Sequence, residues 1–260
     1  MKLTIIGLAS TVFVLAGAVA FGQAPATTTT TTAATNTAPP PKNPWDASAA
    51  VGLTLTRGNS KTVLLSGSLQ GTKKWDQNEV DLGADGVYGE ANGVKNAASI
   101  HGSSQYNRLF TDRFFGYIRL DGLHDGIADI DYRLSAIPGA GYYFIKATNT
   151  TFRGEIGPGV ITEQDSAGTN RTDHTYMTLR LAERFDQKLS ANAKLWESLE
   201  FLPEVDKLKN YIANFELGVE ASMSKSFSLQ TVLQDSYHSE PAEGRLKNDL
   251  KLIAGVKYKF

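Results

Sequence analysis

The sequence contains no cysteine, and it has only four histidines and three methionines. The lack of cysteine excludes disulfide frameworks, thiolate zinc sites and cysteine nucleophiles. An excess of either charge is also missing, because 26 basic side chains stand against 27 acidic ones and the formal net charge is -1. Proteins that bind nucleic acid usually show a basic excess, so we expect no nucleic acid among the partners of this chain.

Motifs for nucleotide chemistry are missing as well. The chain has no Gly-x-Gly-x-x-Gly and no phosphate loop with Lys-Ser or Lys-Thr between a strand and a helix. It has instead glycine at 24 positions and aromatic residues at 10% of its length. Glycine and aromatic residues together favour strands and turns over helices. The composition therefore indicates an all-β protein without indicating a reaction.

The first 24 residues have the features of a secretory signal peptide. Lys2 supplies a positive charge, and residues 3–21 form an uncharged apolar run. Two alternative cleavage sites follow pairs of small residues, Ala18 with Ala20 and Gly22 with Ala24. The alternative is a retained transmembrane anchor, because about 18 apolar residues is the lower limit for spanning a bilayer. No cysteine follows the run, which excludes a lipid-anchored lipoprotein.

Residues 25–44 form a Thr/Pro-rich segment with six consecutive threonines at 27–32 and three prolines at 39–41. Such a segment has no apolar surface to offset the entropy cost of ordering, so it predicts a disordered linker. The folded domain is expected to cover residues 45–260.

From residue 45 onward, apolar residues recur at every second position, which is the period of a β-strand. In the last segment, one face carries Leu250, Leu252, Ala254, Val256, Tyr258 and Phe260, and the other carries Asp249, Lys251, Lys257 and Lys259. Twelve such segments are predicted, at 45–56, 61–74, 78–90, 95–109, 113–124, 130–145, 150–163, 173–186, 191–202, 210–222, 226–238 and 246–260.

The lengths and connections of these segments favour a closed antiparallel transmembrane β-barrel of about twelve strands. Most segments reach the roughly 9–11 residues that a tilted strand needs to cross a bilayer. The even-numbered links are short, whereas several odd-numbered links are longer and polar, notably 164–172, 203–209 and 239–245. Outer-membrane barrels have short periplasmic turns and longer external loops. With an even number of strands, the first strand begins and the last strand ends on the same side of the membrane, which is expected to be the periplasmic side.

A soluble β-sandwich is the main alternative, because its strands also alternate apolar and polar residues. The barrel is favoured by strand length, by a polar face rich in Gly, Ser and Thr, and by aromatic residues near strand ends. Those aromatic residues are Trp45, Tyr106, Phe185, Phe201, Tyr237, Tyr258 and Phe260. Pro138 and Pro158 remove ladder donors, so a bulge or an edge-like irregularity is expected near each.

The polar faces of the segments carry charges of both signs, which the barrel would direct into its lumen. They are Glu79, Asp81, Asp85, Arg119, Asp121, Arg153, Glu155, Arg180, Arg184, Glu200, Glu216, Glu220, Lys251 and Lys257. Charges at membrane depth are tolerated inside a barrel, where they pair or are hydrated. Such a set can simply fill the lumen with ion pairs and water, or it can set the selectivity of a pathway for small solutes.

Two further groups of residues suggest other chemistry. His101 and Ser103 share a strand face, which allows a lipid-modifying hydrolase, although a serine nucleophile also needs direct contact with its base and an orienting group. His238 with Ser239 is a weaker pair, because adjacent residues point to opposite faces. An acidic cluster near the third external loop fits no EF-hand spacing, so a solvated loop is expected there. The cluster consists of Asp121, His124, Asp125, Asp129 and Asp131.

Several motifs in the folded part resemble one bacterial family. Trp45, Gly52, the Gly58-Asn59-Ser60 turn and the terminal 257–260 stretch are similar to those of domain of unknown function 481, over roughly residues 45–260. Members are often labelled salt-induced outer membrane proteins, and the family carries no assigned catalytic residues. The end of the chain also resembles the signal that the barrel assembly machinery reads. That signal comprises Val256, Tyr258 and Phe260.

These observations lead to one expected function and two alternatives. We expect a non-enzymatic barrel of the Gram-negative outer membrane, without a cofactor, a catalytic site or a metal site. It would be structural or a narrow, porin-like passage for ions and small solutes, and the resemblance implies a link with osmotic stress. Its expected partners are outer-membrane lipid, lipopolysaccharide and the barrel assembly machinery. The alternatives are an outer-membrane lipid-modifying hydrolase and a soluble periplasmic β-sandwich binding module.

Overall fold

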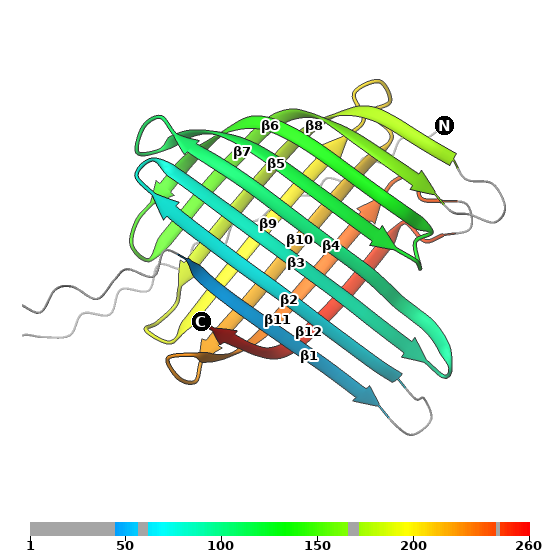
Figure 1. The fold of residues 1–260 in the computed structure, drawn as a ribbon, viewed down its shortest axis with the longest axis horizontal. Coiled ribbons are helices and arrows are strands. Elements are labelled where there is room, and N and C mark those ends of the chain that lie inside the picture. Colours follow the sequence, from blue (N-terminus) through cyan, green and yellow to red (C-terminus); the bar gives the residue numbers. More distant parts are fainter. Residues whose placement is uncertain (1–44, 57–61, 166–171, 243–244) are drawn as a thin grey trace, which may run out of the picture. The chain divides into compact units, whose positions relative to one another are not determined.

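The computed structural model describes residues 45–56, 62–165, 172–242 and 245–260 (Figure 1). The predicted signal peptide, the predicted linker and the Gly58-Asn59-Ser60 turn lie outside the described residues. In the ranges given above, no helix is long and apolar enough to cross a membrane. The described elements are β-strands, as the composition indicates.

Twelve strands are present in the described part of the chain. They are β1 (Asp46–Thr56), β2 (Thr62–Trp75), β3 (Asn78–Ala91), β4 (Val94–Leu109), β5 (Phe114–Asp125), β6 (Ile130–Lys146), β7 (Thr150–Asp165), β8 (Thr172–Lys188), β9 (Ala193–Pro203), β10 (Tyr211–Ser222), β11 (Phe227–His238) and β12 (Asn248–Lys259). Their number and positions agree closely with the twelve segments predicted from the period of two.

The strands form one closed barrel in which each strand pairs antiparallel with its sequence neighbours, and β1 pairs with β12. The closing ladder places Ala49 opposite Tyr258 and Val51 opposite Val256. Beyond it, the Phe260 amide donates a hydrogen bond to the Ala47 carbonyl at 3.0 Å. Closure confirms the predicted barrel and excludes the alternative of two stacked sheets.

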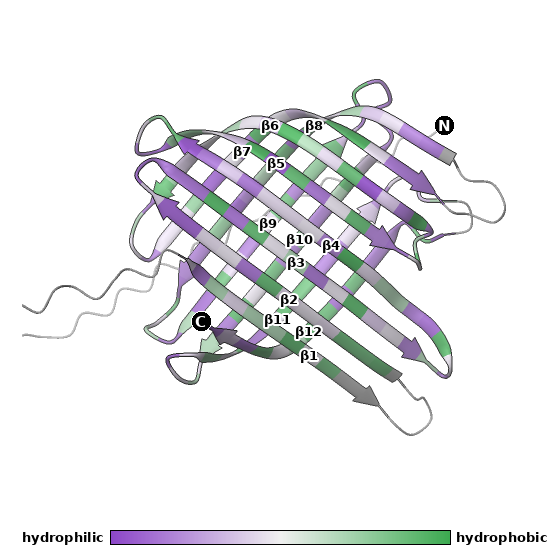
Figure 2. Ribbon diagram, viewed as in Figure 1, coloured by the Kyte–Doolittle hydropathy of each residue, from purple (hydrophilic) through white to green (hydrophobic). Residues whose placement is uncertain are grey.

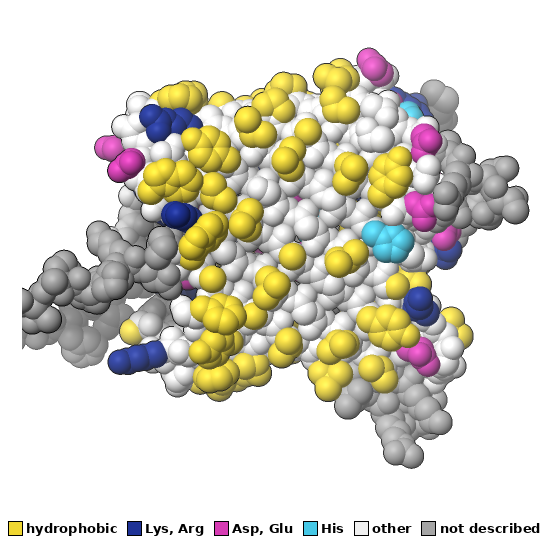
Figure 3. All heavy atoms as spheres, viewed as in Figure 1, with side chains coloured by type: hydrophobic (Ala, Val, Ile, Leu, Met, Phe, Trp, Pro, Cys, Tyr) yellow, Lys and Arg dark blue, Asp and Glu magenta, His cyan; other side chains and the backbone are white. Residues whose placement is uncertain are grey.

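Side chains alternate between the outer face of the wall and the lumen, as the sequence pattern predicts. On β5, Phe115 and Tyr117 point inward and are 1% and 3% exposed, whereas Ile118 and Leu120 point outward and are 55% and 51% exposed. The alternation is visible along the ribbons in Figure 2. In Figure 3, apolar side chains are spread over the visible wall among small side chains and backbone, and charged side chains gather near its two ends. The barrel therefore presents an apolar band to its surroundings.

The two ends of the barrel differ. Short links of two to four residues join β2 to β3, β4 to β5, β6 to β7, β8 to β9 and β10 to β11, and we call this end the turn end. Longer links at the opposite end, the loop end, join β9 to β10 and β11 to β12. The β3–β4 link is an exception at the loop end, a two-residue turn in which Asn92 and Gly93 have φ of 52° and 81°. Both values lie in the left-handed region that Asn-Gly turns favour.

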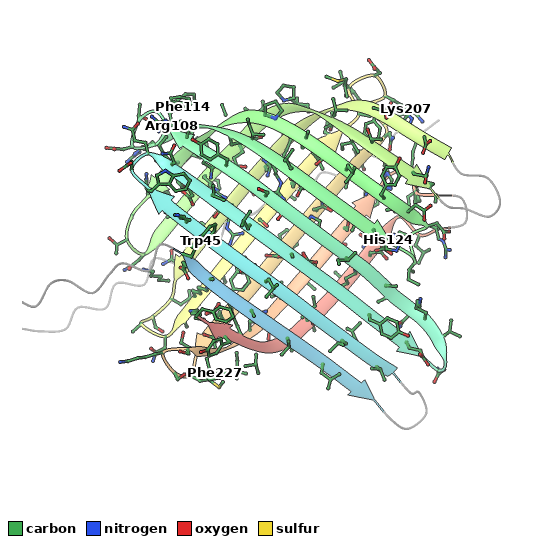
Figure 4. The ribbon with its side chains drawn as sticks, in the orientation of Figure 1. Trp45, Arg108, Phe114, His124, Lys207 and Phe227 are labelled. Carbon is green, nitrogen blue, oxygen red and sulfur yellow. The ribbon has the colours of Figure 1, made fainter. Side chains whose placement is uncertain are left out.

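Aromatic side chains gather on the outer face near the turn end, where Figure 4 labels Trp45, Phe114 and Phe227. Neighbouring aromatic pairs there have ring centroids 5.1–6.5 Å apart, namely Trp75 with Tyr106, Phe110 with Phe114, Tyr142 with Phe144, and Phe227 with Tyr258. A second cluster on β9, β10 and β11 consists of Phe201, Tyr211 and Tyr237. Two aromatic bands are typical of barrels that meet two membrane interfaces.

Pro138 on β6 and Pro158 on β7 face each other across one ladder. Pairing between β6 and β7 stops after Ala136, which lies opposite Val160, and resumes at Ala140, which lies opposite Ile156. The residues in between, including Pro138 and Pro158, form no ladder pairs with each other. The register is the same on both sides of the gap, because the shifts in this ladder lie elsewhere. The expected irregularity is therefore present as a gap in pairing rather than a bulge.

Large rings pack flat against glycine inside the barrel. Trp196 on β9 lies opposite Gly218 on β10, and a Cβ atom at Gly218 would come within 2.1 Å of the indole. Phe115 on β5 lies over Gly141 on β6 in the same way, with 2.2 Å to a Cβ atom there. Glycine at these positions lets the wall accept a ring without losing closure.

The first prediction concerns this packing. Gly218→Ala should lower the free energy of unfolding by about 1–3 kcal/mol, because the added methyl group displaces Trp196 in a packed wall. Gly102→Ala is the matched control, since a Cβ atom there meets nothing within 4 Å. Urea titration of both variants in detergent micelles measures the difference. Equal midpoints for the two variants would contradict the packing described here.

Candidate functional site

The lumen of the barrel contains a cavity of about 540 Å³. Residues from all twelve strands line it, and polar and charged side chains predominate among those that point inward. A water-accessible space of this kind inside a closed barrel is the natural candidate for a functional site, because small-solute sites are concave and enclosed.

The structure places most of the charged residues predicted for the lumen around this cavity. Eleven of the fourteen line it, namely Asp85, Arg119, Asp121, Arg153, Glu155, Arg180, Arg184, Glu200, Glu216, Lys251 and Lys257. The remaining three contact other side chains, Glu79 with Lys74, Asp81 with Thr72 and Glu220 with lysines. The strands thus bring together residues that are far apart in the sequence.

Arg180 on β8 is the centre of the most buried charge network. Its guanidinium donates to Glu155 on β7 at 2.7 Å and to Glu200 on β9 at 2.6 Å. It also donates to the Tyr117 hydroxyl on β5 at 3.2 Å. Arg180 is only 5% exposed, and a buried guanidinium is tolerated when its donors are satisfied in this way.

Glu155 links this network to neighbouring strands. Its carboxylate lies 3.2 Å from the Arg153 Nε atom and accepts a hydrogen bond from the Gln105 side chain at 3.2 Å. On the other side of Gln105, Arg119 on β5 is paired with Asp121 at 2.5 Å. Charges of opposite sign therefore alternate along this part of the lumen, and no large field of one sign develops there.

His101 is held between two carboxylates. Its Nδ1 atom lies 3.0 Å from Asp85 and its Nε2 atom 3.4 Å from Asp121. Both ring nitrogens are thus directed at carboxylate oxygens rather than at the Ser103 hydroxyl, which a serine nucleophile would require. The weaker pair is also separated, because His238 contacts Arg133 while Ser239 accepts from the Tyr211 amide. The geometry gives no support to the hydrolase alternative.

Ion pairs cross the loop end of the barrel. The β5–β6 and β11–β12 links stand on opposite sides of the ring of strands, yet Arg245 contacts Asp129 at 2.5 Å. Two strands are also linked near this end, because the Arg133 side chain on β6 donates to the His238 ring on β11 at 3.4 Å. Lys207 on the β9–β10 link pairs with Glu240 on the β11–β12 link. These contacts narrow the opening at the loop end.

The bridge also affects the charge of its members. The hydrogen bond from the Arg245 guanidinium holds the pKa of the Asp129 carboxyl below its usual range. A carboxyl whose pKa is lowered on folding contributes its stabilisation above the usual pKa and loses it as the pH falls through the lowered value. The bridge is therefore intact at neutral pH and breaks in acid.

The acidic cluster expected at the third external loop does not assemble as one group. Asp121 pairs with Arg119 inside the lumen, and Asp129 pairs with Arg245. His124 directs its Nδ1 atom at the Asp131 carbonyl at 2.8 Å. In the described part of the chain, no group of three or more His, Asp or Glu residues is arranged to hold a metal ion.

Sequence reasoning missed several charged residues that point into the lumen, among them Arg133, Glu163 and Lys194. Arg133 on β6 pairs with Glu163 on β7 at 2.6 Å, and Lys194 on β9 lines the cavity. Arg133 precedes the exposed Leu134, and Lys194 precedes Trp196 by two positions on the same face. The period of two was therefore the signal that could have placed all three inside.

The residues of the expected assembly signal form one row on the outer face of β12. Val256, Tyr258 and Phe260 are all exposed there. Tyr258 contacts Phe227 at 5.1 Å and Phe260 at 5.1 Å between ring centroids. The row belongs to the aromatic band at the turn end.

The second prediction concerns the buried network. Glu155→Gln should lower the free energy of unfolding by about 3–5 kcal/mol, because it leaves two buried arginines short of a carboxylate. Asp186→Asn is the control, since its pair with Arg184 at 3.0 Å has side chains that are 37% and 45% exposed, and such pairs contribute at most about 1 kcal/mol. Chemical unfolding in micelles compares the two. A loss at Glu155 no larger than at Asp186 would show that the network is not buried.

Comparisons with known proteins agree with this architecture. No curated protein matches the chain. Among solved structures, the NanC porin is similar with a TM-score of 0.51 at 8% identity, over 83% of this chain and 100% of the porin. Two further barrels have lower TM-scores. The translocator domain of the autotransporter NalP from Neisseria meningitidis gives 0.45 at 11% identity, over 83% of this chain and 87% of that domain. The KdgM porin in complex with disordered oligogalacturonate gives 0.46 at 8% identity, over 82% and 99%.

At these identities the likeness shows the fold alone. A family profile, in contrast, matches residues 49–260, which is most of the chain and nearly the whole barrel. The matching family is described as "Protein of unknown function, DUF481". The protein therefore belongs to the DUF481 family.

Proposed function

We propose that this protein is a non-enzymatic barrel of the bacterial outer membrane that provides a narrow passage for ions or small solutes. The observation that carries the proposal is the polar cavity of about 540 Å³ inside a closed barrel with an apolar outer face. An apolar outer band favours lipid, and a charged, hydrated interior is the usual arrangement of a barrel that conducts solutes.

The orientation follows from the two ends. The start of β1 and the end of β12 lie at the turn end together with the short turns, as expected for the periplasmic side. The longer links at the loop end then face away from the periplasm. In this orientation the Asp129–Arg245 bridge crosses the external opening. Lipid would contact the outer band, lipopolysaccharide the external rim, and the assembly machinery the terminal row of Val256, Tyr258 and Phe260.

The passage is narrow because side chains occupy much of the lumen. Near the turn end, Phe115, Gln105 and Asn107 point inward and are at most 2% exposed. Arg180 and its partners fill the middle of one wall. Such a lumen suits hydrated ions and small molecules better than folded or bulky substrates. A link with osmotic stress rests on the resemblance to proteins labelled salt-induced, and a passage for ions fits it.

The third prediction tests the passage and its external bridge. Purified protein in a planar bilayer should conduct, and Asp129→Asn should raise the conductance at neutral pH by opening the bridge. An exposed ion pair contributes up to about 1 kcal/mol, so the ratio of open to closed bridge should rise by roughly fivefold at most. Lys95→Gln is a control that removes a charge from another strand at the same end.

The fourth prediction is a pH dependence of the same conductance. Acid protonates Asp129 and breaks the bridge, so conductance should rise as the pH falls from the usual aspartate pKa of about 4 through the lowered pKa of Asp129. The Asp129→Asn variant should already be open and lack this step, and 1 M salt should weaken the bridge in the unaltered protein. A barrel that inserts but never conducts would refute the passage. Identical pH profiles for the two proteins would refute only the role of the bridge.

A further inference from the structure

Three lysines converge on one carboxylate at the turn end of the lumen. The Nζ atoms of Lys194, Lys257 and Lys259 lie 3.2, 3.4 and 2.7 Å from the Glu220 carboxylate oxygens. Glu220 is only 1% exposed. We call these four residues the lysine cluster. It contains three positive charges and one negative charge.

The folding of three strands brings the cluster together. Lys194 is the second residue of β9, Glu220 lies near the end of β10, and the other two lysines lie near the end of β12. All of these positions are at the turn end (Figure 1). Lys194 and Lys257 also line the lumenal cavity, so the cluster opens onto the passage.

Neighbouring side chains hold two of the ammonium groups in place. The Lys257 Nζ atom donates to the Gln70 side chain on β2 at 3.4 Å. The Lys194 Nζ atom lies 5.5 Å from the centre of the Trp196 ring. Trp196 is itself fixed, because it packs on Gly218 and its Nε1 atom donates to Glu216 at 2.7 Å. The cluster is therefore a built arrangement rather than a group of freely moving surface lysines.

The balance of charge in the cluster differs from that in the rest of the lumen. Arg119, Arg153 and Arg180 each face at least one carboxylate. In the cluster, one carboxylate faces three ammonium groups. Charges inside a membrane barrel are stable when paired or hydrated, so two surplus positive charges at this depth attract counter-ions. Ammonium groups with free N–H donors suit the oxygens of phosphate or sulfate.

We propose that the lysine cluster is a binding site for a small, doubly charged oxyanion, with inorganic phosphate as its simplest representative. The proposal deepens the proposed function, because it assigns an anion site to the periplasmic opening of the passage. The anion sits beside Lys194 and Lys257, where the cavity gives access, and the Glu220 carboxylate competes with it for the same ammonium groups. A bound phosphate reduces the passage of other anions through that opening.

Binding can be measured without any assumption about conduction. Folded protein in a detergent that lacks phosphate groups is titrated with inorganic phosphate by isothermal calorimetry, with sodium chloride as the reference anion. The unaltered protein should bind phosphate, and Lys194→Gln should weaken binding about tenfold, the order expected for one charge-assisted contact. Lys194 is 44% exposed in its side chain, so its replacement is expected to leave folding intact.

Lys251→Gln is the matched control. Lys251 lies on β12 with Lys257 and faces the same cavity, but it contacts Ser99 and not the cluster. It should bind phosphate as the unaltered protein does. If Lys194→Gln and Lys251→Gln weakened phosphate binding equally, only the total charge of the lumen would matter, and the proposed site would be overturned. Absence of phosphate binding, or equal binding of chloride, would overturn it as well.

A change of opposite sign gives a second test. Glu220→Gln removes the carboxylate that competes for the lysines, so a folded variant should bind phosphate more tightly than the unaltered protein. Unchanged or weaker binding by the folded variant would contradict the proposal. If this variant does not fold, Lys259→Gln replaces it and should weaken phosphate binding, whereas unchanged binding would count against the site.

Bilayer recordings separate the anion site from the passage. Phosphate added on the turn-end side should lower the chloride current of the unaltered protein and affect the Lys194→Gln variant less. A conducting barrel that ignores phosphate, and also fails to bind it by calorimetry, refutes the anion site and leaves the passage standing. A barrel that binds phosphate by calorimetry but conducts no ions refutes the passage and leaves the site standing.

Discussion

The ladder between β1 and β12 is the contact on which the rest of the structure depends. It joins the two edges of a twelve-strand sheet, so that β1 and β12 also have a paired neighbour on both sides. In hydrocarbon an unpaired backbone group costs several kcal/mol, and a sheet with an apolar outer face is stable there only when closed. Closure also creates an inside, where polar residues can pair and hold water. The apolar wall and the charged lumen are therefore two consequences of one constraint.

The fold could be predicted from the sequence because a closed barrel requires outward and inward residues to alternate regularly along each strand. Rows such as Leu250, Leu252 and Ala254 repeat every second residue, and each slip of one position would turn the whole row inward. The length of the segments and the alternation of short and long links then indicated that the strands form a membrane barrel. The tight Asn92-Gly93 turn was not anticipated, although Asn-Gly is a strong turn signal. The gap opposite Pro138 follows from the missing proline N–H, but the pairing of Pro138 with Pro158 depends on the register between β6 and β7.

The site was less predictable, because the period of two says which residues face inward but not which of them meet. Arg180 and Glu155 contact each other as neighbours on β7 and β8, but Arg180 reaches Tyr117 on β5 only through the curvature of the wall. The bridge between Asp129 and Arg245 joins links separated by 116 positions on opposite sides of the ring. The lysine cluster combines three strands, β9, β10 and β12, and β12 is not paired with either of the other two. Such contacts depend on barrel shape and side-chain length, which single-residue patterns do not contain.

The strands of the barrel present an apolar face to lipid and a polar face to water, and labels on adjacent residues of one strand test this arrangement most directly. Leu134 is exposed on the outer face of β6, and Ser135 lines the lumenal cavity. The sequence has no cysteine, so Leu134→Cys and Ser135→Cys can each carry one fluorescent label in protein reconstituted into vesicles. Spin-labelled lipid chains should quench the label at position 134 and spare the one at 135, and aqueous iodide should do the reverse. Quenching of both labels by iodide alone would show that no lipid covers the wall and would contradict the account.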